Sequence, residues 1–489
     1  MKKISMVLTA AVTLCAGCRI KQPYSVPVAP VPAAYQNAAP ASTAGATKEW
    51  KEAVPADAQA KSKWWEAYRD PQLNALEERI EINNQSLKAA VVRYAEAHAL
   101  VLESRSRRQP TISAGGDVAR DRLSANKGNA PSASNTDFND FTVGLSASWE
   151  PDLWGRIRTL IGASVQQAQA SAADLENMRL SLQAELAFDY FTLRALDNEE
   201  KVLHDSVDAY AKALQMMQDR YDGGLANRAD VEQARTQLEA AGAQETDLSE
   251  SRTHYANAIA VLTGELPEGF ALAEQAHTMT PPEIPTGVPS DLLERRPDIA
   301  AEERRVALAN SQIGLARSAY YPQVILSGAV GLESKSLGRW FTSPSRYWAV
   351  GPVFSETLFD AGRRRAGVAQ AAAGYDESVA NYRQQVLTAF QQVEDNLASL
   401  RILANEAARQ QRAVEAARRA EQLAMNRYQG GMVTYLDVIS TQSIRLQNER
   451  IAVGIERRRM QASVALIRAL GGGWRSNNLP RAAALTAGK

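Results

Sequence analysis

The sequence predicts a mainly α-helical chain with membrane β-strands, built by internal duplication. The first observation is a repeated turn, since Arg220-Tyr-Asp-Gly-Gly224 recurs as Arg427-Tyr-Gln-Gly-Gly431 at an offset of 207 residues. The second is that long helical patterns are interrupted twice by segments in which apolar and small polar residues alternate. A fixed offset indicates a duplicated structural unit, and alternation indicates strands with two unlike faces.

The repeat extends well beyond the turn. Each of three further landmarks recurs at the same offset of 207 residues. These pairs are Gly155 and Gly362, Leu193 and Leu400, and Gly264 and Gly471. Over a hundred positions therefore repeat without a net gap.

The chemistry of the repeated turn predicts a helical hairpin. Two adjacent glycines suit the left-handed conformations that end a helix. Asn227 with Asp230, and Thr434 with Asp437, have the spacing of a capping box that starts the next helix, with Asp in place of the usual Glu.

Composition limits the function classes. The chain has 489 residues, and Lys plus Arg equals Asp plus Glu at 55 each, with no sustained basic stretch that would indicate nucleic-acid binding. Both cysteines lie near the start, which excludes a disulfide scaffold and a cysteine-ligated metal site. Catalytic motifs are also absent. Metal-ligand spacing is absent among the histidines, which are His98, His204, His254 and His277. We therefore expect no metal, no cofactor and no enzyme activity.

The amino terminus predicts export and lipid attachment. Residues 1–17 have the charged start and short apolar run of a signal peptide. Ala16-Gly17-Cys18 resembles the end of a bacterial lipobox, with Leu14 one place early, which implies N-acyl and S-diacylglycerol lipid on Cys18. The alternative is an ordinary signal peptide with an incidental cysteine. Residues 18–60 are rich in Pro and Ala, and we interpret them as an extended arm.

The two repeats have the same expected order of elements. The first, 61–264, contains a helix from Leu73 to Arg108, a β-hairpin at 111–150, a long helix at 155–221 and a short helix at 230–263. Residues 265–297 form a proline-rich connection. The second repeat, 298–473, contains a helix, a hairpin at 322–357, a long helix at 362–428 and a short helix at 437–470, before a tail at 474–489. Each long helix would reach about 100 Å.

The strands favour a membrane location. From Phe141 to Trp149 apolar residues alternate with small polar ones, and Tyr347 and Trp348 lie near another strand end. In lipid, open sheet edges are untenable and a closed barrel needs at least about eight strands, so a barrel has to draw strands from several chains. The alternative is a pair of hairpins packed on a soluble domain.

Four groups of motifs are spaced along the chain. They are Trp64-Trp65 with Asp70-Pro71-Gln72-Leu73, Trp149-Glu-Pro-Asp-Leu-Trp-Gly-Arg156, Arg295-Arg296-Pro-Asp-Ile299, and Gly351-Pro352 with Leu358-Phe-Asp-Ala-Gly-Arg363. Together with the duplicated turn, they resemble the TolC family of outer-membrane efflux channels from about residue 60 to 473, most closely its NodT-type lipoprotein subgroup.

The resemblance implies a homotrimer. Four strands per chain would form a twelve-stranded barrel in outer-membrane lipid, continuous with a long periplasmic α-helical barrel, with residues 265–297 in an equatorial region. The channel would be a passive duct joined by a periplasmic adaptor to an inner-membrane pump, commonly of the resistance-nodulation-division type. Expected cargoes are drugs, solvents, metal ions or other small toxic compounds, as in multidrug resistance.

The resemblance also assigns the repeated turns. It implies adaptor contact at two tips: Gly223, Gly224 and Leu225, and Gly430, Gly431 and Met432. It places Asp230, Tyr428 and Asp437 near the closed periplasmic aperture, with Tyr428 holding Asp230 across the hairpins. Val433 and Ser440 stand where some members have an arginine and an acidic residue, so closure would use fewer polar links. As an alternative, Asp230 and Asp437 serve only as carboxylates at helix starts.

Three other interpretations stay open at this point. A type I protein-secretion duct shares the channel features. A periplasmic adaptor would lack two alternating hairpins, and a structural coiled coil would show sustained heptads and no strands.

Overall fold

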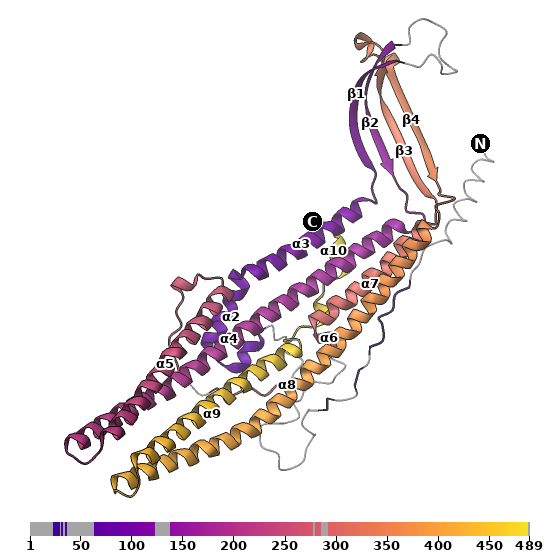
Figure 1. Ribbon diagram of the computed structural model, residues 1–489. Coiled ribbons are helices and arrows are strands. Elements are labelled where there is room, and N and C mark those ends of the chain that lie inside the picture. Colours follow the sequence, from indigo (N-terminus) through magenta and orange to yellow (C-terminus); the bar gives the residue numbers. More distant parts are fainter. Residues whose placement is uncertain are drawn as a thin grey trace.

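The computed structural model describes residues 23–29, 31–32, 35–36, 63–122, 137–276, 279–284 and 292–487. The expected signal peptide and Cys18 lie outside these residues, as does most of the amino-terminal arm. The molecule is elongated. Its strands lie at one end and two helical hairpins reach the other (Figure 1).

Four antiparallel strands form one sheet in the order β1-β2-β3-β4. They are β1 (Thr111–Arg122), β2 (Asp137–Trp149), β3 (Gln323–Ser334) and β4 (Arg346–Ser355). The two repeats meet where β2 pairs with β3, for example Leu145 with Val330. Within this chain β1 and β4 are therefore the edges of the sheet.

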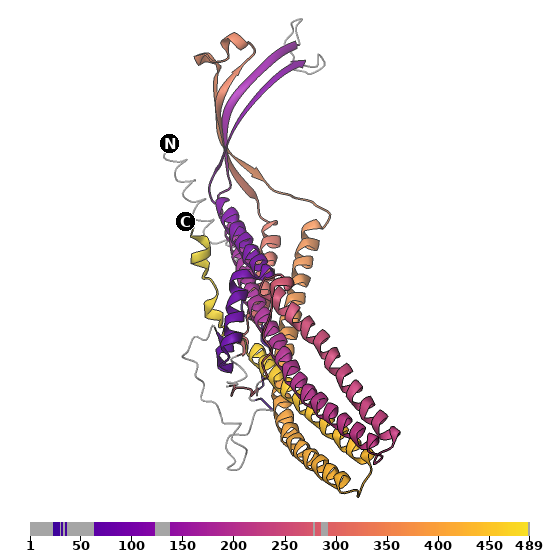
Figure 2. The same ribbon diagram turned by 90° about the vertical axis from the view of Figure 1, so that its left-hand side faces the viewer.

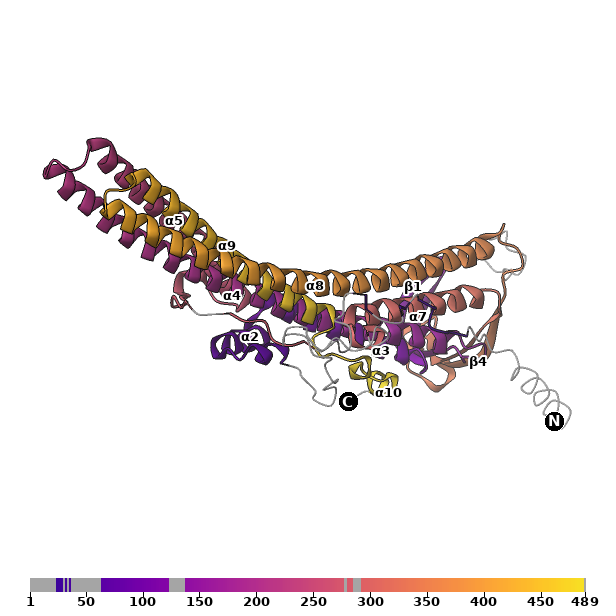
Figure 3. The same cartoon turned by 90° about the horizontal axis from the view of Figure 1, so that it is seen from below.

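Four helices make the two hairpins. The long ones are α4 (Arg156–Asp222) and α8 (Arg363–Gln429), of 67 residues each. The short ones are α5 (Arg228–Leu262) and α9 (Tyr435–Ala469), of 35 residues each. Figure 3 shows α8 along the length of the helical part. Both short helices begin two residues earlier than expected, because Asn227 and Thr434 are the caps and the helix starts directly after each cap.

The helices lie side by side as one layer. Next to the sheet, α3 (Gln85–Ser106) packs on α4, and α7 (Pro297–Ser318) packs between α4 and α8. Toward the tips, α5 packs on α4, α4 on α9, and α9 on α8. Each level of the layer thus holds four helices, with α8 at one side and α3 or α5 at the other (Figure 2).

Short elements complete the chain. Of these, α10 packs on α3 and α4 and buries Leu485, so the described part of the carboxyl-terminal tail is docked on the helical layer. The short elements are η1 (Trp64–Tyr68), α2 (Pro71–Asn83), η2 (Pro267–Gly269), α6 (Leu292–Arg295), η4 (Leu337–Arg339), η5 (Ser343–Ser345), η6 (Ser476–Asn478) and α10 (Ala482–Thr486).

The helix expected from Leu73 to Arg108 is in fact two helices. Asn84 separates α2 from α3 with an extended backbone, and its side-chain oxygen accepts from Leu87 N as the cap of α3. Its amide nitrogen donates to the carbonyl of Leu262 at the end of α5, at 2.8 Å. The apolar pattern carries a trace of this break, since Ile80 is followed only by Leu87.

The second repeat uses the same contact with a different residue. Arg296 lies 212 residues after Asn84, between α6 and α7, and its Nη1 donates to the carbonyl of Ala469 at the end of α9, at 2.9 Å. Two glycines allow the close approach: a Cβ on Gly264 would lie 2.6 Å from Asn83 O, and one on Gly471 would lie 1.9 Å from Arg295 O. Duplication has therefore kept the contact, with an asparagine in one copy and an arginine in the other.

A buried ionic cluster fastens the equatorial connection to the helices. Asp197 on α4 contacts Arg194 at 2.6 Å and Arg252 of α5 at 2.9 Å, and it accepts from Gln275 N at 3.0 Å. Arg194, fully buried, also donates to Ala273 O and to Gln72 of α2. The carboxylate of Asp197 therefore holds α4, α5 and the 272–275 segment together.

The described part of the amino-terminal arm has no helix or strand, and it packs on the helical layer. Tyr35 is buried in a cluster with Tyr382 and Val386 of α8. Val28 O accepts from Arg383, and Tyr24 Oη donates to Glu303 of α7. Since α7 and α8 meet the sheet near residues 318 and 363, the arm runs toward the sheet as its residue numbers fall.

Candidate functional site: the helical tips

Both tips end in the same backbone motif. Leu225 N donates to Arg220 O and Gly224 N to Tyr221 O, at 2.7 and 2.9 Å. Met432 and Gly431 repeat these bonds, both at 2.9 Å, to carbonyls of the last turn of α8. This pair of bonds is the Schellman motif, which ends a helix in a left-handed residue.

Only the second glycine of each pair is left-handed, which corrects the expectation for two. Gly224 and Gly431 have φ of 72° and 70°. Gly223 and Gly430 have φ of −80°, a value that other residues adopt readily. The need for glycine therefore rests on the second position of each turn.

The capping boxes are present at both restarts. Asp230 N donates to Asn227 Oδ1 at 2.9 Å, and Asn227 N donates back to Asp230 at 3.4 Å. At the other tip Asp437 Oδ2 accepts from Thr434 N at 3.0 Å and from the Thr434 hydroxyl at 2.7 Å. Both carboxylates thus satisfy backbone groups at a helix start, where the helix dipole also favours negative charge.

An apolar side chain projects beyond each turn. Leu225 is 74 % exposed and Met432 is 69 % exposed. The two turns therefore present apolar side chains to solvent at equivalent positions of the two repeats. Both tips lie together at the end of the molecule farthest from the sheet (Figure 2).

A small core joins the two hairpins just behind the tips. Tyr428 of α8 stacks on Tyr435 of α9 with ring centroids 5.4 Å apart, and Met217 and Val231 of the other hairpin belong to the same cluster. The Arg220 guanidinium lies over the Tyr428 ring at 5.1 Å. The hairpins are therefore held together by packing around one aromatic ring.

The expected bond from Tyr428 to Asp230 is replaced by a different contact. Tyr428 Oη donates to Met217 Sδ at 3.2 Å, while Asp230 stays in its capping box. Burial raises the pKa of Tyr428, and the nearby Asp230 carboxylate adds to that rise. Sequence reasoning gave no role at the tips to Met217, Tyr435 or Arg220. The steps from Tyr210 to Ala213 and Met217 mark the buried helix face that could have indicated Met217.

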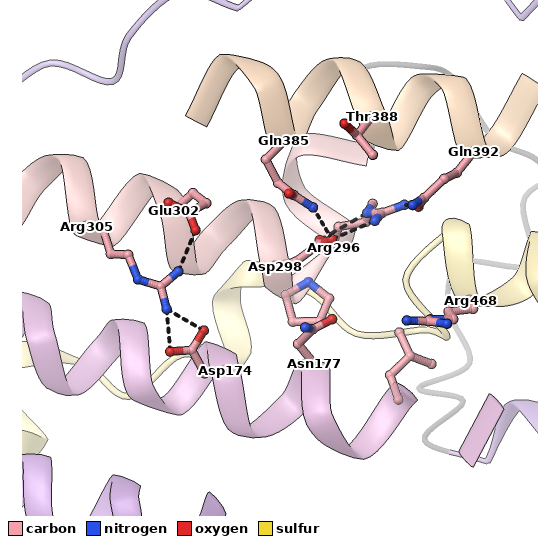
Figure 4. A pocket seen from close by; sticks show the side chains of 12 residues that line it. Asp174, Asn177, Arg296, Asp298, Glu302, Arg305, Gln385, Thr388, Gln392 and Arg468 are labelled. Atoms are coloured by element: carbon pink, nitrogen blue, oxygen red, sulfur yellow. Dashed lines mark hydrogen bonds and ion pairs between the residues drawn. The ribbon is translucent and has the colours of Figure 1, made fainter. Parts of the chain in front are cut away.

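A polar cavity of about 360 Å³ lies higher up, between α4, α7 and α8 (Figure 4). Arg296 pairs with Asp298 at 2.6 Å, and Arg305 pairs with Asp174 at 2.6 Å. Gln385 of α8 also donates to Asp298, at 2.6 Å. Burial alone would raise the pKa of Asp298, but its bonds to Arg296 lower it below the ordinary value. These paired charges connect the helices of both repeats, so the Arg-Arg-Pro-Asp-Ile motif stabilises the layer.

The described residues hold neither a metal site nor a membrane-spanning helix. In the ranges given above, no three His, Cys, Asp or Glu side chains come together as a metal site would require. No helix within those ranges has an apolar stretch long enough to cross a membrane.

This chain joins a sheet with one apolar face to helices about 100 Å long. That architecture is expected of a channel protein of the cell envelope. Comparison with known proteins agrees. The family described as "Outer membrane efflux protein" matches residues 76–265 and 288–472. The chain belongs to this family, whose members are transport channels of the outer membrane rather than enzymes.

Individual relatives cover almost the whole chain. The pyoverdine export outer membrane protein OpmQ of Pseudomonas aeruginosa is 32% identical over 426 residues, 86% of this chain and 89% of that protein. The toluene efflux pump outer membrane protein TtgI of Pseudomonas putida is 29% identical over 469 residues, 95% and 97% of the two chains. The structure of the outer-membrane channel OprN superposes with a TM-score of 0.83 at 29% identity, covering 93% of this chain and 100% of that one. The resemblance to efflux channels and the fold class are confirmed.

Proposed function

We propose that this chain is the exit duct of a tripartite efflux system and that it acts as a homotrimer. The observation that carries the proposal is that one chain leaves its edges open. In the sheet, β1 and β4 each have a partner on one side only. Because lipid offers backbone groups no hydrogen bonds, three sheets have to close into one twelve-stranded barrel.

The helical layer has matching open sides. The helices at the two sides of the layer next to the sheet, α3 and α8, carry apolar side chains that one chain leaves exposed. These are Val91, Val92 and Leu100 on α3, and Leu387 and Ile402 on α8. Placing three layers side by side covers these residues and continues the barrel as a helical tube.

We assign the tips to a periplasmic adaptor, which joins the duct to an inner-membrane pump; the family resemblance favours a pump of the resistance-nodulation-division type. The exposed Leu225 and Met432, each on a rigid turn with its two glycines, support this docking role. Asp230, Tyr428 and Asp437 form the periplasmic aperture in this proposal. The duct is passive, and the energy comes from the pump.

Lipid on Cys18 fits the path of the arm. Glu303, the partner of Tyr24, lies 15 residues before the end of α7, which is about 22 Å along the helix. Six residues of fully extended chain, from Tyr24 to Cys18, span up to about 22 Å. A lipid on Cys18 could therefore reach the membrane surface at the base of the barrel.

The substrates proposed are small toxic compounds such as drugs, solvents or metal ions. Two of the relatives are named for the export of pyoverdine and the efflux of toluene.

The test begins with detergent extraction and electrophoresis of unheated and boiled samples. A trimer that dissociates only on heating supports the barrel, whereas a monomer in both lanes would overturn it. Benzoylphenylalanine at Leu225 or Met432 should then crosslink to the adaptor in cells. The same probe at Leu266, exposed on the equatorial connection, is the matched control and should not. Rescue of solvent or drug resistance in an efflux-deficient host separates this function from protein secretion.

A further inference from the structure

The two faces of the sheet carry opposite charges at their outer end, where the hairpins turn. Directly paired residues on antiparallel strands share a face, so the register assigns each side chain. The face that holds Val143 and Leu145 also holds one carboxylate, Asp137, and three arginines: Arg120, Arg122 and Arg346. The opposite face holds four carboxylates: Asp117, Asp121, Asp140 and Glu333.

Two of the three strand arginines on this face have an exposed apolar neighbour two residues away. Val118 precedes Arg120 on β1, and Trp348, which is 76 % exposed, follows Arg346 on β4. Residues two apart on a strand lie on one face, so apolar surface passes directly into basic surface on both edge strands.

The loop between β3 and β4 extends the same pattern. Trp340 stacks on Phe141 of the apolar face with ring centroids 5.5 Å apart, and its Nε1 donates to Leu332 O at 3.3 Å. The loop therefore folds over the apolar face. It presents Arg339 with Leu337 on one side and Phe341, 72 % exposed, on the other.

Three of these cations have no carboxylate partner. In the described part of the chain, no Asp or Glu lies within ion-pair distance of Arg120, Arg339 or Arg346. Arg122 is different, since it pairs with Asp137 at 3.7 Å. Lys335 is not counted among the unpaired cations either, because its ammonium group lies over the Phe138 ring.

An apolar depression lies farther down the same face. It has a volume of about 300 Å³ and forms where Gly328 has no side chain, between Leu145 of β2 and Trp348 and Val350 of β4. A hydrocarbon chain fits such a lining, whereas water does not.

We propose that Arg120, Arg339 and Arg346 form a binding surface for the phosphate groups of an acylated, phosphorylated lipid of the outer leaflet, with an acyl chain in the depression at Gly328. This rests on the proposed barrel, which turns the apolar face toward lipid. Guanidinium groups bind phosphate oxygens in pairs, and unpaired arginines beside exposed apolar side chains match the boundary between headgroup and acyl chain.

The experiment uses the purified full-length trimer in neutral detergent. It is titrated with mixed micelles of bis-phosphorylated lipid A, and retained lipid is measured by native mass spectrometry. Arg120→Gln, Arg339→Gln and Arg346→Gln should each weaken binding about fivefold, and more when combined. The Arg→Lys versions should weaken it less, because they keep the charge. Dephosphorylated lipid A should bind weakly, and inorganic phosphate should not displace the lipid because it lacks acyl chains.

Two controls isolate the site. Arg228→Gln removes an exposed cation at a tip, and Glu333→Gln changes the opposite face of the sheet. Neither should alter binding. Equal affinity of wild type and the single variants, or of lipid with and without phosphate, would overturn the proposal. Displacement by inorganic phosphate alone would overturn the lipid assignment. Loss of the heat-modifiable trimer before lipid is added would count against the barrel instead.

Discussion

Glu77 is a buried carboxylate whose loss of hydration is not offset by hydrogen bonds. It is 0 % exposed on α2, and among the described residues neither of its oxygens has a hydrogen-bond partner. Burial raises the pKa of Glu77 well above its ordinary value, and the charge of Glu81 raises it further. The folded chain therefore holds a proton on Glu77 more tightly than the unfolded chain does.

This predicts a pH dependence of stability. A carboxyl group with a raised folded-state pKa stabilises the fold most below its unfolded value of 4.5, and that contribution falls as pH rises toward the folded value. Glu77→Gln should remove this fall and raise the melting temperature at pH 8 more than at pH 5. Glu78→Gln, an exposed neighbour, is the control. An unchanged pH profile in Glu77→Gln would contradict the prediction.

At the scale of single elements, the most informative feature is the docking of each short helix on a break in its neighbour. Asn84 and Arg296 both bind the last carbonyl of a short helix, and Gly264 and Gly471 let the chains approach. The contact fixes where α5 and α9 end relative to the equatorial connection. It is a tertiary contact between segments over 170 residues apart.

Asn84→Ala should destabilise the protein by about 2 kcal/mol, because a helix cap is lost and a buried carbonyl loses its donor. Arg296→Ala should cost more, since it also leaves Asp298 buried without its ion pair. Gln85→Ala, exposed beside Asn84, should change little. Thermal unfolding followed by circular dichroism measures all three. Equal melting temperatures for Asn84→Ala and Gln85→Ala would contradict the role of the contact.

These elements also show what sequence could and could not predict. The long helices and four strands follow from periodicity, because burial on one face imposes it directly. The break at Asn84 leaves only a trace in that pattern, the long step from Ile80 to Leu87, because the bond from Asn84 to Leu262 O is a tertiary contact. The tips were predictable as turns from Gly-Gly and the capping boxes. The bond from Tyr428 to Met217 depends on how two hairpins pack, which no local pattern encodes.

At the scale of the whole molecule, the ring of Tyr428 holds the hairpins together near the proposed aperture. Tyr428→Ala should raise the leak conductance of the closed channel in a planar bilayer, because it removes the ring between Met217 and Tyr435. Tyr428→Phe keeps the ring and should change conductance little. A leak of equal size in both variants would show that the hydroxyl, and not the packing, holds the aperture.

The open edges of one chain have a consequence for genetics. A subunit with a damaged β4 edge can still pair through its intact β1 edge, so it enters trimers and leaves their barrels unclosed. In a cell that makes both forms, most trimers would contain at least one defective subunit. Loss-of-function alleles at the edges should therefore be dominant over the wild type, whereas alleles that unfold the whole chain should be recessive.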